Sequence, residues 1–220
     1  MTSKPKPPIQ VENTMKLRIF REHIQRVIGT ADHVRPFVCD GSPYDCVAFV
    51  VGINPASKVP FWPYWSDETG FNKRAWLDQY REQRMSEPSK ENRTRRRPIS
   101  NTRQRIKRIA KAASPTKILE TNLYALPTSR ASELRSKDKD ARVFDFLLAE
   151  IAPRAILLHG KDPADHFRKQ FGYAPTPEFN EIMINKKSVY VAAVAALSRV
   201  SYDRASELGK TIQAKIALNR

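Results

Sequence analysis

A polar amide follows directly after one of the most apolar runs of the chain. Residues 45–53 read DCVAFVVGI, and Asn54 and Pro55 come next. A side-chain amide carries hydrogen-bond donors and an acceptor, so Asn54 can orient a water molecule or pair with the edge of a planar heterocycle. Unlike a carboxylate, it cannot act as a strong general base. The alternative is an Asx turn that only shapes the corner before Pro55.

Three more short apolar runs are followed by segments that can bind or react. The runs cover residues 116–123, 154–159 and 188–196, and the segments after them read TNLYALPT, HGK and ALSRVS. Asn122, in the first of these segments, can read the edge of a base or simply cap a loop. Continuous apolar runs of this length predict buried strands.

Helical patterns separate these predicted strands. They cover residues 11–28, 76–85, 101–113, 140–151, 162–171 and 202–218. Alternating strands and helices predict an α/β fold, a three-layer sandwich with a central, mainly parallel four-stranded sheet flanked by helices. Ligands of such sheets bind beyond the carboxyl ends of the strands, which is where the four segments lie.

The composition points to a polyanionic partner. The chain has 220 residues, a formal net charge of +16 and a pI of about 10.1. A charge of this sign favours nucleic acid, although a solvated basic surface without a ligand is the alternative. No run of about 18 apolar residues predicts a membrane span, and the start MTSKPKPPIQ has no apolar signal core, so we expect a cytoplasmic protein. Cys39 and Cys46 are expected to be ordinary thiols.

We expect one domain over residues 11–220, preceded by a loose basic arm at residues 1–10. Residues 81–111 carry many more Lys and Arg than Glu and form a basic insertion. The cations expected to contact phosphates there are Arg95, Arg96 and Arg97 in a loop and Arg105 and Arg108 on a helix. A solvated loop without a ligand is the alternative.

Together, the four segments resemble motifs of the uracil-DNA glycosylase superfamily, and most closely those of its mismatch-specific uracil/thymine-DNA glycosylase branch. GINPA at 52–56 is similar to the Gly-Ile-Asn-Pro-Gly motif of that branch, and TNLYALPT at 121–128 to its Thr-Asn-Leu-Val…Pro-Thr segment. AILLHGKDPADHF at 155–167 and ALSRVSYDRASEL at 196–208 resemble its later motifs. The resemblance covers roughly residues 45–215 and implies a uracil-DNA glycosylase-like fold.

The resemblance also implies roles for single residues. Asn54 would position the attacking water, and the pocket for a flipped base would include Gly52, Ile53, Ala56, Phe61 and Asn122. Phe61 would stack on the base, although clustered aromatic residues are more often core. Ala56 would leave space beside a substituent at C5 of a pyrimidine, unless another residue fills it.

The last motif supplies the predicted contacts with DNA. Leu197 would insert into the base stack as a wedge, or serve only as an apolar contact at a helix start. Ser198 and Arg199 would contact phosphates or the opposite strand.

Ala196 stands where many members of the superfamily carry a histidine that stabilises the anionic base. An alanine side chain offers no hydrogen bond, and the loss of one such donor typically slows an enzyme by around 10²–10³. Two explanations stay open: the natural protein lacks the residue, or an original histidine was replaced. His159 and His166 are possible substitutes, but His159 is expected to close a strand and His166 to face out of a helix.

The sequence therefore predicts a DNA glycosylase, weakened at position 196, that flips out and hydrolyses a modified pyrimidine and leaves an abasic site. Its base would be uracil-type or 5-substituted, including bulky modified cytosines of phage DNA, which suggests a role in DNA repair or phage defence. The alternative is a non-catalytic reader of modified or abasic DNA with the same fold. We expect a monomer with DNA as its partner, no membrane contact, no metal and no other cofactor.

Overall fold

A six-stranded mixed sheet forms the centre of the computed structural model, which describes residues 8–29, 33–86 and 97–218. Four parallel strands lie side by side in the order β5-β2-β6-β8. A short strand at each edge runs antiparallel to its neighbour, β1 beside β5 and β7 beside β8. The strands are β1 (Phe37–Val38), β2 (Ala48–Gly52), β5 (Ile118–Asn122), β6 (Ala155–His159), β7 (Asn180–Ile184) and β8 (Lys187–Val194).

The four expected strands are all present. The expected number of strands was wrong, because β1 and β7 add one strand at each edge of the sheet. β1 has only two residues, which is too short to give a sequence pattern. Strand β7 reads NEIMI and is mostly exposed, so it lacks the apolar run of a buried strand. The edge strands leave the order of the four central strands unchanged.

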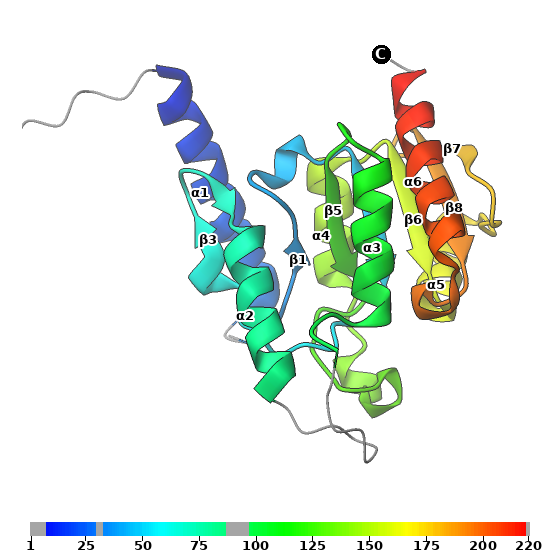
Figure 1. The fold of residues 1–220 in the computed structure, drawn as a ribbon. Coiled ribbons are helices and arrows are strands. Elements are labelled where there is room, and N and C mark those ends of the chain that lie inside the picture. Colours follow the sequence, from blue (N-terminus) through cyan, green and yellow to red (C-terminus); the bar gives the residue numbers. More distant parts are fainter. Residues whose placement is uncertain (1–7, 30–32, 87–96, 219–220) are drawn as a thin grey trace, which may run out of the picture.

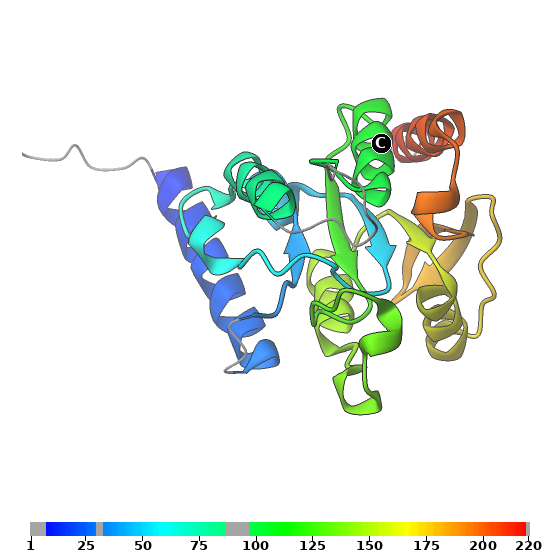
Figure 2. The same cartoon turned by 60° about the horizontal axis from the view of Figure 1, so that its bottom comes forward.

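Helices cover both faces of the sheet (Figures 1 and 2). On one face, α3 (Asn101–Ala112) and α6 (Tyr202–Ala217) pack over Ala48, Val50 and Leu157. On the other, α4 (Arg142–Ile151) and α5 (Lys161–Phe171) pack over the alternate strand residues, among them Phe49 and Val51. The α/β layers follow from this alternation, because successive strand side chains point to opposite faces.

The remaining elements build out the β1 edge of the sheet. Helix α1 (Pro8–Ile28) packs against α4, and α2 (Lys73–Ser86) follows a small hairpin of β3 (Trp65–Ser66) and β4 (Gly70–Phe71). Single 3-10 turns join the elements: η1 (Pro43–Asp45), η2 (Trp62–Tyr64), η3 (Ala131–Glu133), η4 (Ser136–Asp138) and η5 (Leu197–Arg199). Cys39 and Cys46 are buried free thiols.

Two of the predicted segments fall partly outside the described residues. Residues 1–7 of the predicted arm and residues 87–96 of the predicted basic insertion are outside them. The C-terminal part of that insertion is α3, whose Ile106 and Ile109 are buried against α6, so this helix belongs to one face of the sheet. None of the helices within the described ranges is both long and apolar enough to cross a bilayer.

Candidate functional site at the carboxyl ends of the parallel strands

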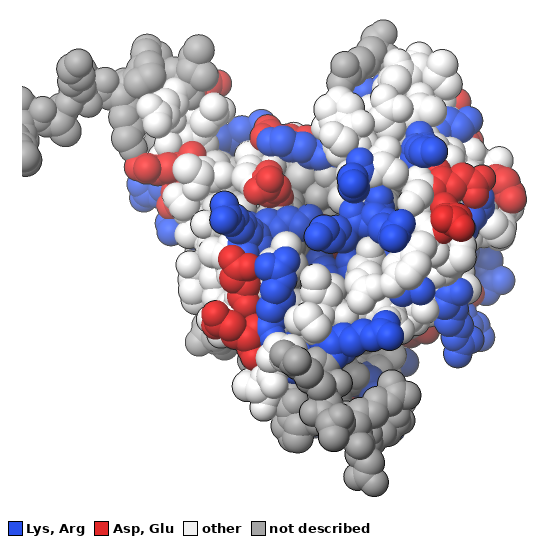
Figure 3. Space-filling view, in the orientation of Figure 1, with Lys and Arg blue, Asp and Glu red and all other residues white. Residues whose placement is uncertain are grey.

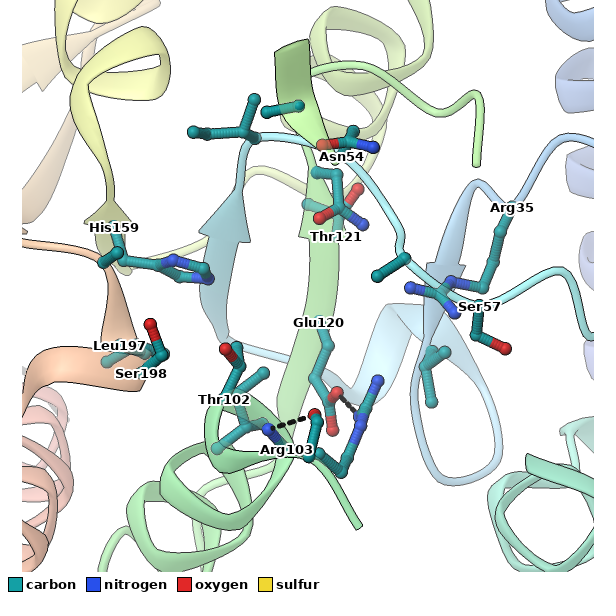
Figure 4. Close-up of a pocket in the computed structure, with 18 of the residues that line it drawn as sticks. Arg35, Asn54, Ser57, Thr102, Arg103, Glu120, Thr121, His159, Leu197 and Ser198 are labelled. Carbon is teal, nitrogen blue, oxygen red and sulfur yellow. Dashed lines mark hydrogen bonds and ion pairs between the residues drawn. The ribbon is translucent and has the colours of Figure 1, made fainter. Parts of the chain in front are cut away.

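A cavity of about 450 Å³ opens at the carboxyl ends of β2, β5 and β6. Its size lies within the range of about 300–1,000 Å³ that is usual for sites that hold small molecules. Its lining comes from the segment after β2, the ends of β5 and β6 with the loop after β5, the first turns of α3, and η5. The region around β1, with Arg35, and Tyr80 of α2 complete it. Figure 4 shows its labelled side chains, with His159 and Arg35 pointing inward from opposite sides.

The loops that follow β2 and β5 stay hydrogen-bonded after the strands end. The amide of Leu123 donates to the Gly52 carbonyl at 2.8 Å, and that of Tyr124 donates to Ile53 at 2.9 Å. The amide of Thr128 then donates to the Pro55 carbonyl at 3.0 Å. These bonds hold the segment that carries Asn54 against the segment that follows Asn122.

The side chain of Asn54 is oriented by this pair of loops. Its Nδ2 donates to Thr128 Oγ1 at 2.7 Å, to the Pro55 carbonyl at 3.2 Å and to the Thr128 carbonyl at 3.4 Å. Carbonyl oxygens only accept, so the NH₂ group must face them and Oδ1 is the end left for a ligand. Asn54 therefore has the form of a fixed acceptor that can hold the hydrogen of a water molecule.

Asn122 and His159 meet over the backbone of Gly52. A Cβ placed on Gly52 would lie 2.8 Å from Asn122 Oδ1 and 2.9 Å from His159 Nε2. Real side chains do not tolerate such contacts, so the close approach of these two polar groups requires glycine at position 52. The three central strands thus bring an amide and an imidazole together beside Asn54.

The surroundings of His159 favour a neutral imidazole. Burial lowers the pKa of His159 from its ordinary value of 6.5 to about 4, because the charged ring would lose its hydration. A neutral imidazole has one N–H donor and one acceptor nitrogen. His159 can therefore donate a hydrogen bond to a ligand at pH 7 without bringing a positive charge.

The other end of the cavity is charged. Glu120 lies two residues before Asn122 on the same face of β5 and is only 5% exposed. Its Oε1 receives Lys73 Nζ at 2.7 Å, and its Oε2 pairs with Arg103 Nη1 (Figure 4). Burial alone would raise the pKa of Glu120, but Arg103 and Lys73 outweigh it and hold this pKa below its usual value. The carboxylate is therefore ionised and fully occupied by two cations.

Arg35 is a third cation at this end, and it has no carboxylate of its own. It is 7% exposed, and its Nη1 is buried without a hydrogen-bond partner among the described residues. Its guanidinium lies 5.1 Å from the centre of the Trp76 ring, and Arg103 lies at the same distance from that ring. Burial and the charge of Arg103 lower the pKa of Arg35 to about 9, so it stays protonated at pH 7.

The chain entering η5 is apolar at Ala196 and Leu197 and polar at the two residues after them. Ala196 lines the cavity and offers no hydrogen bond. Leu197 also lines it but is fully buried in the core beneath α3 and α6. The prediction of Leu197 as a wedge is wrong for this conformation, because a buried core side chain cannot enter a base stack. Ser198 and Arg199 are exposed, as contacts with DNA require, and Ser198 borders the cavity.

Phe61 does not face the cavity. Its ring is fully buried and stacks on Phe71 with centroids 4.8 Å apart, while Phe37 meets its edge at the same distance. The prediction of Phe61 as the stacking ring of the base pocket is therefore corrected: it is part of the aromatic core near β1. Among the other predicted pocket residues, Ile53 and Ala56 line the cavity, and Ala56 is exposed.

Lys and Arg side chains gather across the face that carries α2, α3 and α6 (Figure 3). Arg105 and Arg108 lie over the Tyr202 ring, at 4.2 and 4.3 Å from its centre, and Arg105 Nε also donates to the Val200 carbonyl. Arg97 is exposed, whereas Arg95 and Arg96 lie outside the described residues. Arg105 and Arg108 lie beside the residues that follow η5, and none of the three cations lines the cavity.

In the described ranges, no group of His, Cys, Asp and Glu residues has an arrangement that could hold a metal ion. The polar groups that line the cavity are amides, an imidazole, hydroxyls and charged side chains. They suit recognition by hydrogen bonds and the positioning of water.

Compared with known families and with curated proteins, the chain matches no family model and no curated sequence. The four segments that end the central strands all contribute residues to the one cavity described above.

Sequence reasoning missed most of the charged end and undervalued His159. Glu120 gave a signal, since a carboxylate stands in the buried run KILETNL where apolar residues are expected. His159 also gave one, because it is the last residue of a strand whose carboxyl end faces the ligand side. Arg35 gave none, since it lies before a strand of two residues. His166 contacts Asp145 at 3.3 Å on α4 and is not part of the cavity.

Proposed function

We propose that the protein is a DNA glycosylase that receives a flipped pyrimidine in this cavity and hydrolyses its N-glycosidic bond. The observation that carries the proposal is the meeting of Asn54, Asn122 and neutral His159 at the carboxyl ends of three parallel strands. The four motif segments and the basic face support the same proposal. A base must leave the stack to reach a cavity of this kind.

In this proposal, each polar group has one task. The Oδ1 of Asn54 accepts a hydrogen from a water molecule and directs the water's oxygen to the anomeric carbon. As the new C–O bond forms, the electron pair of the C–N bond passes to the base nitrogen, and the proton that the attacking water loses ends on the released base. The N–H of His159 and the amide of Asn122 then donate to the base while it carries negative charge, which lowers the barrier only if the donors are held in place beforehand.

Neutral His159 fills a role that Ala196 cannot. A histidine at position 196 would approach the base from η5, whereas His159 approaches from β6 on the neighbouring side of the same cavity. The lowered pKa of His159 favours donation from a neutral ring, because a protonated ring would be disfavoured by burial. We therefore assign the stabilisation of the leaving base to His159.

The base is proposed to be a 5-substituted pyrimidine. Ala56 lines the cavity with a single methyl group and leaves its neighbourhood open to solvent. An open side tolerates substituents at C5, from hydroxymethyl to the bulky groups of modified phage cytosines. Activity on plain uracil together with failure on every 5-substituted base would contradict this assignment.

The test is base release from oligonucleotides that carry uracil, 5-substituted uracils or 5-substituted cytosines. The wild-type chain should leave alkali-labile abasic sites in at least one of them, and His159→Ala should slow this release while DNA binding is kept. His33→Ala is the matched control, since His33 is exposed and does not line the cavity. Absence of release by the wild type with every base would remove the enzymatic proposal.

The second candidate is a non-catalytic reader of modified or abasic DNA, and Ala196 is the observation in its favour. Ala196→His separates the two. If His159 already supplies the donor, the added histidine changes the rate of base release little. If a donor is missing, Ala196→His creates or strongly increases release. A reader would bind modified DNA selectively with both chains and release nothing.

A further inference from the structure

The charged end of the cavity contains one more cation than its contacts explain. Both oxygens of Glu120 are occupied, Oε1 by Lys73 and Oε2 by Arg103. Arg35 is as buried as Glu120, lines the same cavity and keeps an Nη1 without a hydrogen-bond partner among the described residues. A buried, charged donor without an acceptor is costly, and in native structures it usually marks an absent ion, water or ligand.

We propose that the cavity between Arg35 and Arg103 contains a subsite for an anionic group of carboxylate or phosphate size, carried by the nucleic-acid ligand. Glu120 does not oppose such a group, because its charge is already matched by two cations. The three cations and one carboxylate of this cluster leave an excess of positive charge. A guanidinium presents a planar fork of N–H groups that matches carboxylate and phosphate oxygens.

The first turn of α3 opens on the same end of the cavity. Ser100 caps this helix by accepting from the Arg103 amide at 3.2 Å, and Ser100, Thr102 and Arg103 all line the cavity. The N-terminal end of a helix favours negative charge. The end of the helix and Arg35 both favour a negative charge at the same end of the cavity.

The Trp76 ring contacts both guanidiniums but supplies no conventional hydrogen-bond acceptor to them. It lies 5.1 Å from each, and such a contact attracts a cation through the ring face. The contact with the ring face leaves the Nη1 of Arg35 without a hydrogen-bond partner among the described residues. Arg35 is therefore oriented before a ligand arrives.

Two parts of the ligand could supply the anion: a substituent on the flipped base, or a phosphate of the strand. The link to nucleic acid rests on the proposed function, whereas the preference for an anion does not. Calorimetric titrations of the full chain at constant ionic strength distinguish the two sources. The base arm compares 5-carboxyuracil with the neutral 5-carbamoyluracil. The phosphate arm compares an unmodified trinucleotide carrying a 5′-phosphate with the same trinucleotide carrying a 5′-hydroxyl.

The wild type should prefer the anionic member of at least one pair by about 10- to 100-fold, as expected for a hydrogen bond to a charged group. Arg35→Met should abolish that preference. Arg142→Met is the matched control, because Arg142 is exposed, pairs with Asp140 and does not line the cavity. Preference only in the base arm assigns the anion to the base, and preference only in the phosphate arm assigns it to the strand.

A stability measurement guards against a variant that merely misfolds. Without ligand, Arg35→Met should unfold at the same or a higher temperature than the wild type, because it removes a buried donor that lacks a hydrogen-bond partner while Glu120 keeps its two paired cations. The anionic probe should raise the melting temperature of the wild type and of Arg142→Met, but not that of Arg35→Met.

The proposal is overturned if the wild type binds both members of each pair equally, or if Arg35→Met keeps the preference. It is also overturned if Arg35→Met is strongly destabilised without ligand, since Arg35 would then be satisfied within the protein. None of these results depends on base release. Anion binding without base release would therefore contradict only the proposed function. Base release without a preference for the anion would contradict only the proposed subsite.

Discussion

The two ends of the cavity are built on one strand but differ in chemistry. At the carboxyl end of β5, Asn122 meets His159 and Asn54, and all three are uncharged. Two residues earlier on the same face, Glu120 is surrounded by Lys73, Arg103 and Arg35. The distance between the two ends is small, yet one end uses neutral hydrogen-bonding groups and the other uses buried ions.

The chemical difference between the two ends follows from how deep each group lies in the sheet. At the strand ends a polar group reaches the cavity and its solvent, so a neutral amide needs only a neighbour that orients it. Inside the sheet a carboxylate is expensive to bury unless cations match it, and here the matching cations outnumber it. The neutral end is therefore suited to position and polarise a ligand, and the charged end to select the charge of that ligand.

Removing the carboxylate of the charged end should have the largest effect on stability. Glu120→Gln removes the counter-charge of the partly buried Lys73 and Arg103 beside the buried Arg35, and breaking a buried pair typically costs about 3–5 kcal/mol. Urea unfolding at pH 7 measures this loss. Glu12→Gln, on the exposed surface of α1, is the control and should leave the free energy of unfolding unchanged.

If Glu120→Gln unfolds like the wild type, the cluster is not the ionic unit described here. The pH dependence gives a second check. Because the pKa of Glu120 is below 4.5 in the folded protein, its stabilising contribution is complete above pH 4.5 and is lost as the pH falls below it. The variant should lack this part of the acid denaturation.

At the neutral end, Asn54→Ala should cost activity more than stability. It removes the acceptor that holds the water, and losing one oriented group of this kind typically slows catalysis by about 10²–10³-fold. Single-turnover base release measures the effect, with Asn13→Ala on exposed α1 as the control. Equal rates for Asn54→Ala and the wild type would show that the water is held elsewhere.

His159 should make the fold sensitive to mild acid. With a pKa of about 4 when folded and 6.5 when unfolded, the imidazole binds its proton more readily in the unfolded chain between these values. Stability should therefore be unaffected above pH 6.5 and fall between pH 6.5 and 4, by at most about 3 kcal/mol.

His159→Asn should flatten this part of the stability curve and leave the decline below pH 4.5 in place. Melting temperatures across pH 4–8 measure it, with His33→Asn as the control. A curve for His159→Asn parallel to that of the wild type would contradict a buried neutral imidazole. The two ends of the cavity would thus be told apart by the pH at which each destabilises the protein.

Gly52→Ala should give a smaller loss that couples both polar groups. The added methyl group would meet Asn122 Oδ1 and the His159 ring at less than contact distance, and overpacking of this kind typically costs about 1–3 kcal/mol. Chemical denaturation measures the cost. Base release should fall as well, because both donors must move. Gly172→Ala is not a suitable control, because Gly172 has a φ of 66°, which alanine rarely adopts. The control for a change of one methyl group is Ala48→Gly, which lies in β2 like Gly52.

Much of the fold could be predicted because each central strand is a continuous apolar run and the helices have helical apolar spacing. The runs at 45–53, 116–123, 154–159 and 188–196 became β2, β5, β6 and β8, and their order in the chain placed four segments at one edge. Asn54, Ala56 and Asn122 followed from that placement. The strands of two residues and the exposed strand β7 have no such pattern, so they could not be foreseen.

The errors at the site arose where closeness in sequence was taken for closeness in space. Phe61 is seven residues after Asn54, but the chain between them leaves the cavity and delivers the ring to the aromatic core. Leu197 stands in the expected segment, yet its side chain turns into the core under α3 and α6. Lys73 and Arg103 reach Glu120 from other parts of the chain, and no local pattern in the sequence predicts these contacts.

The amides of Leu123, Tyr124 and Thr128 donate to carbonyls at the end of β2 and just after it. These hydrogen bonds continue the pairing of β2 and β5 into the loops that follow the two strands. Hydrogen exchange would reveal this directly. The amides of these three residues should be protected like those of β5, while amides of the exposed residues 129–131 exchange quickly. A map of exchange rates would thus place the end of the rigid body at Thr128 rather than at Asn122, so that Asn54 belongs to the slowly opening unit.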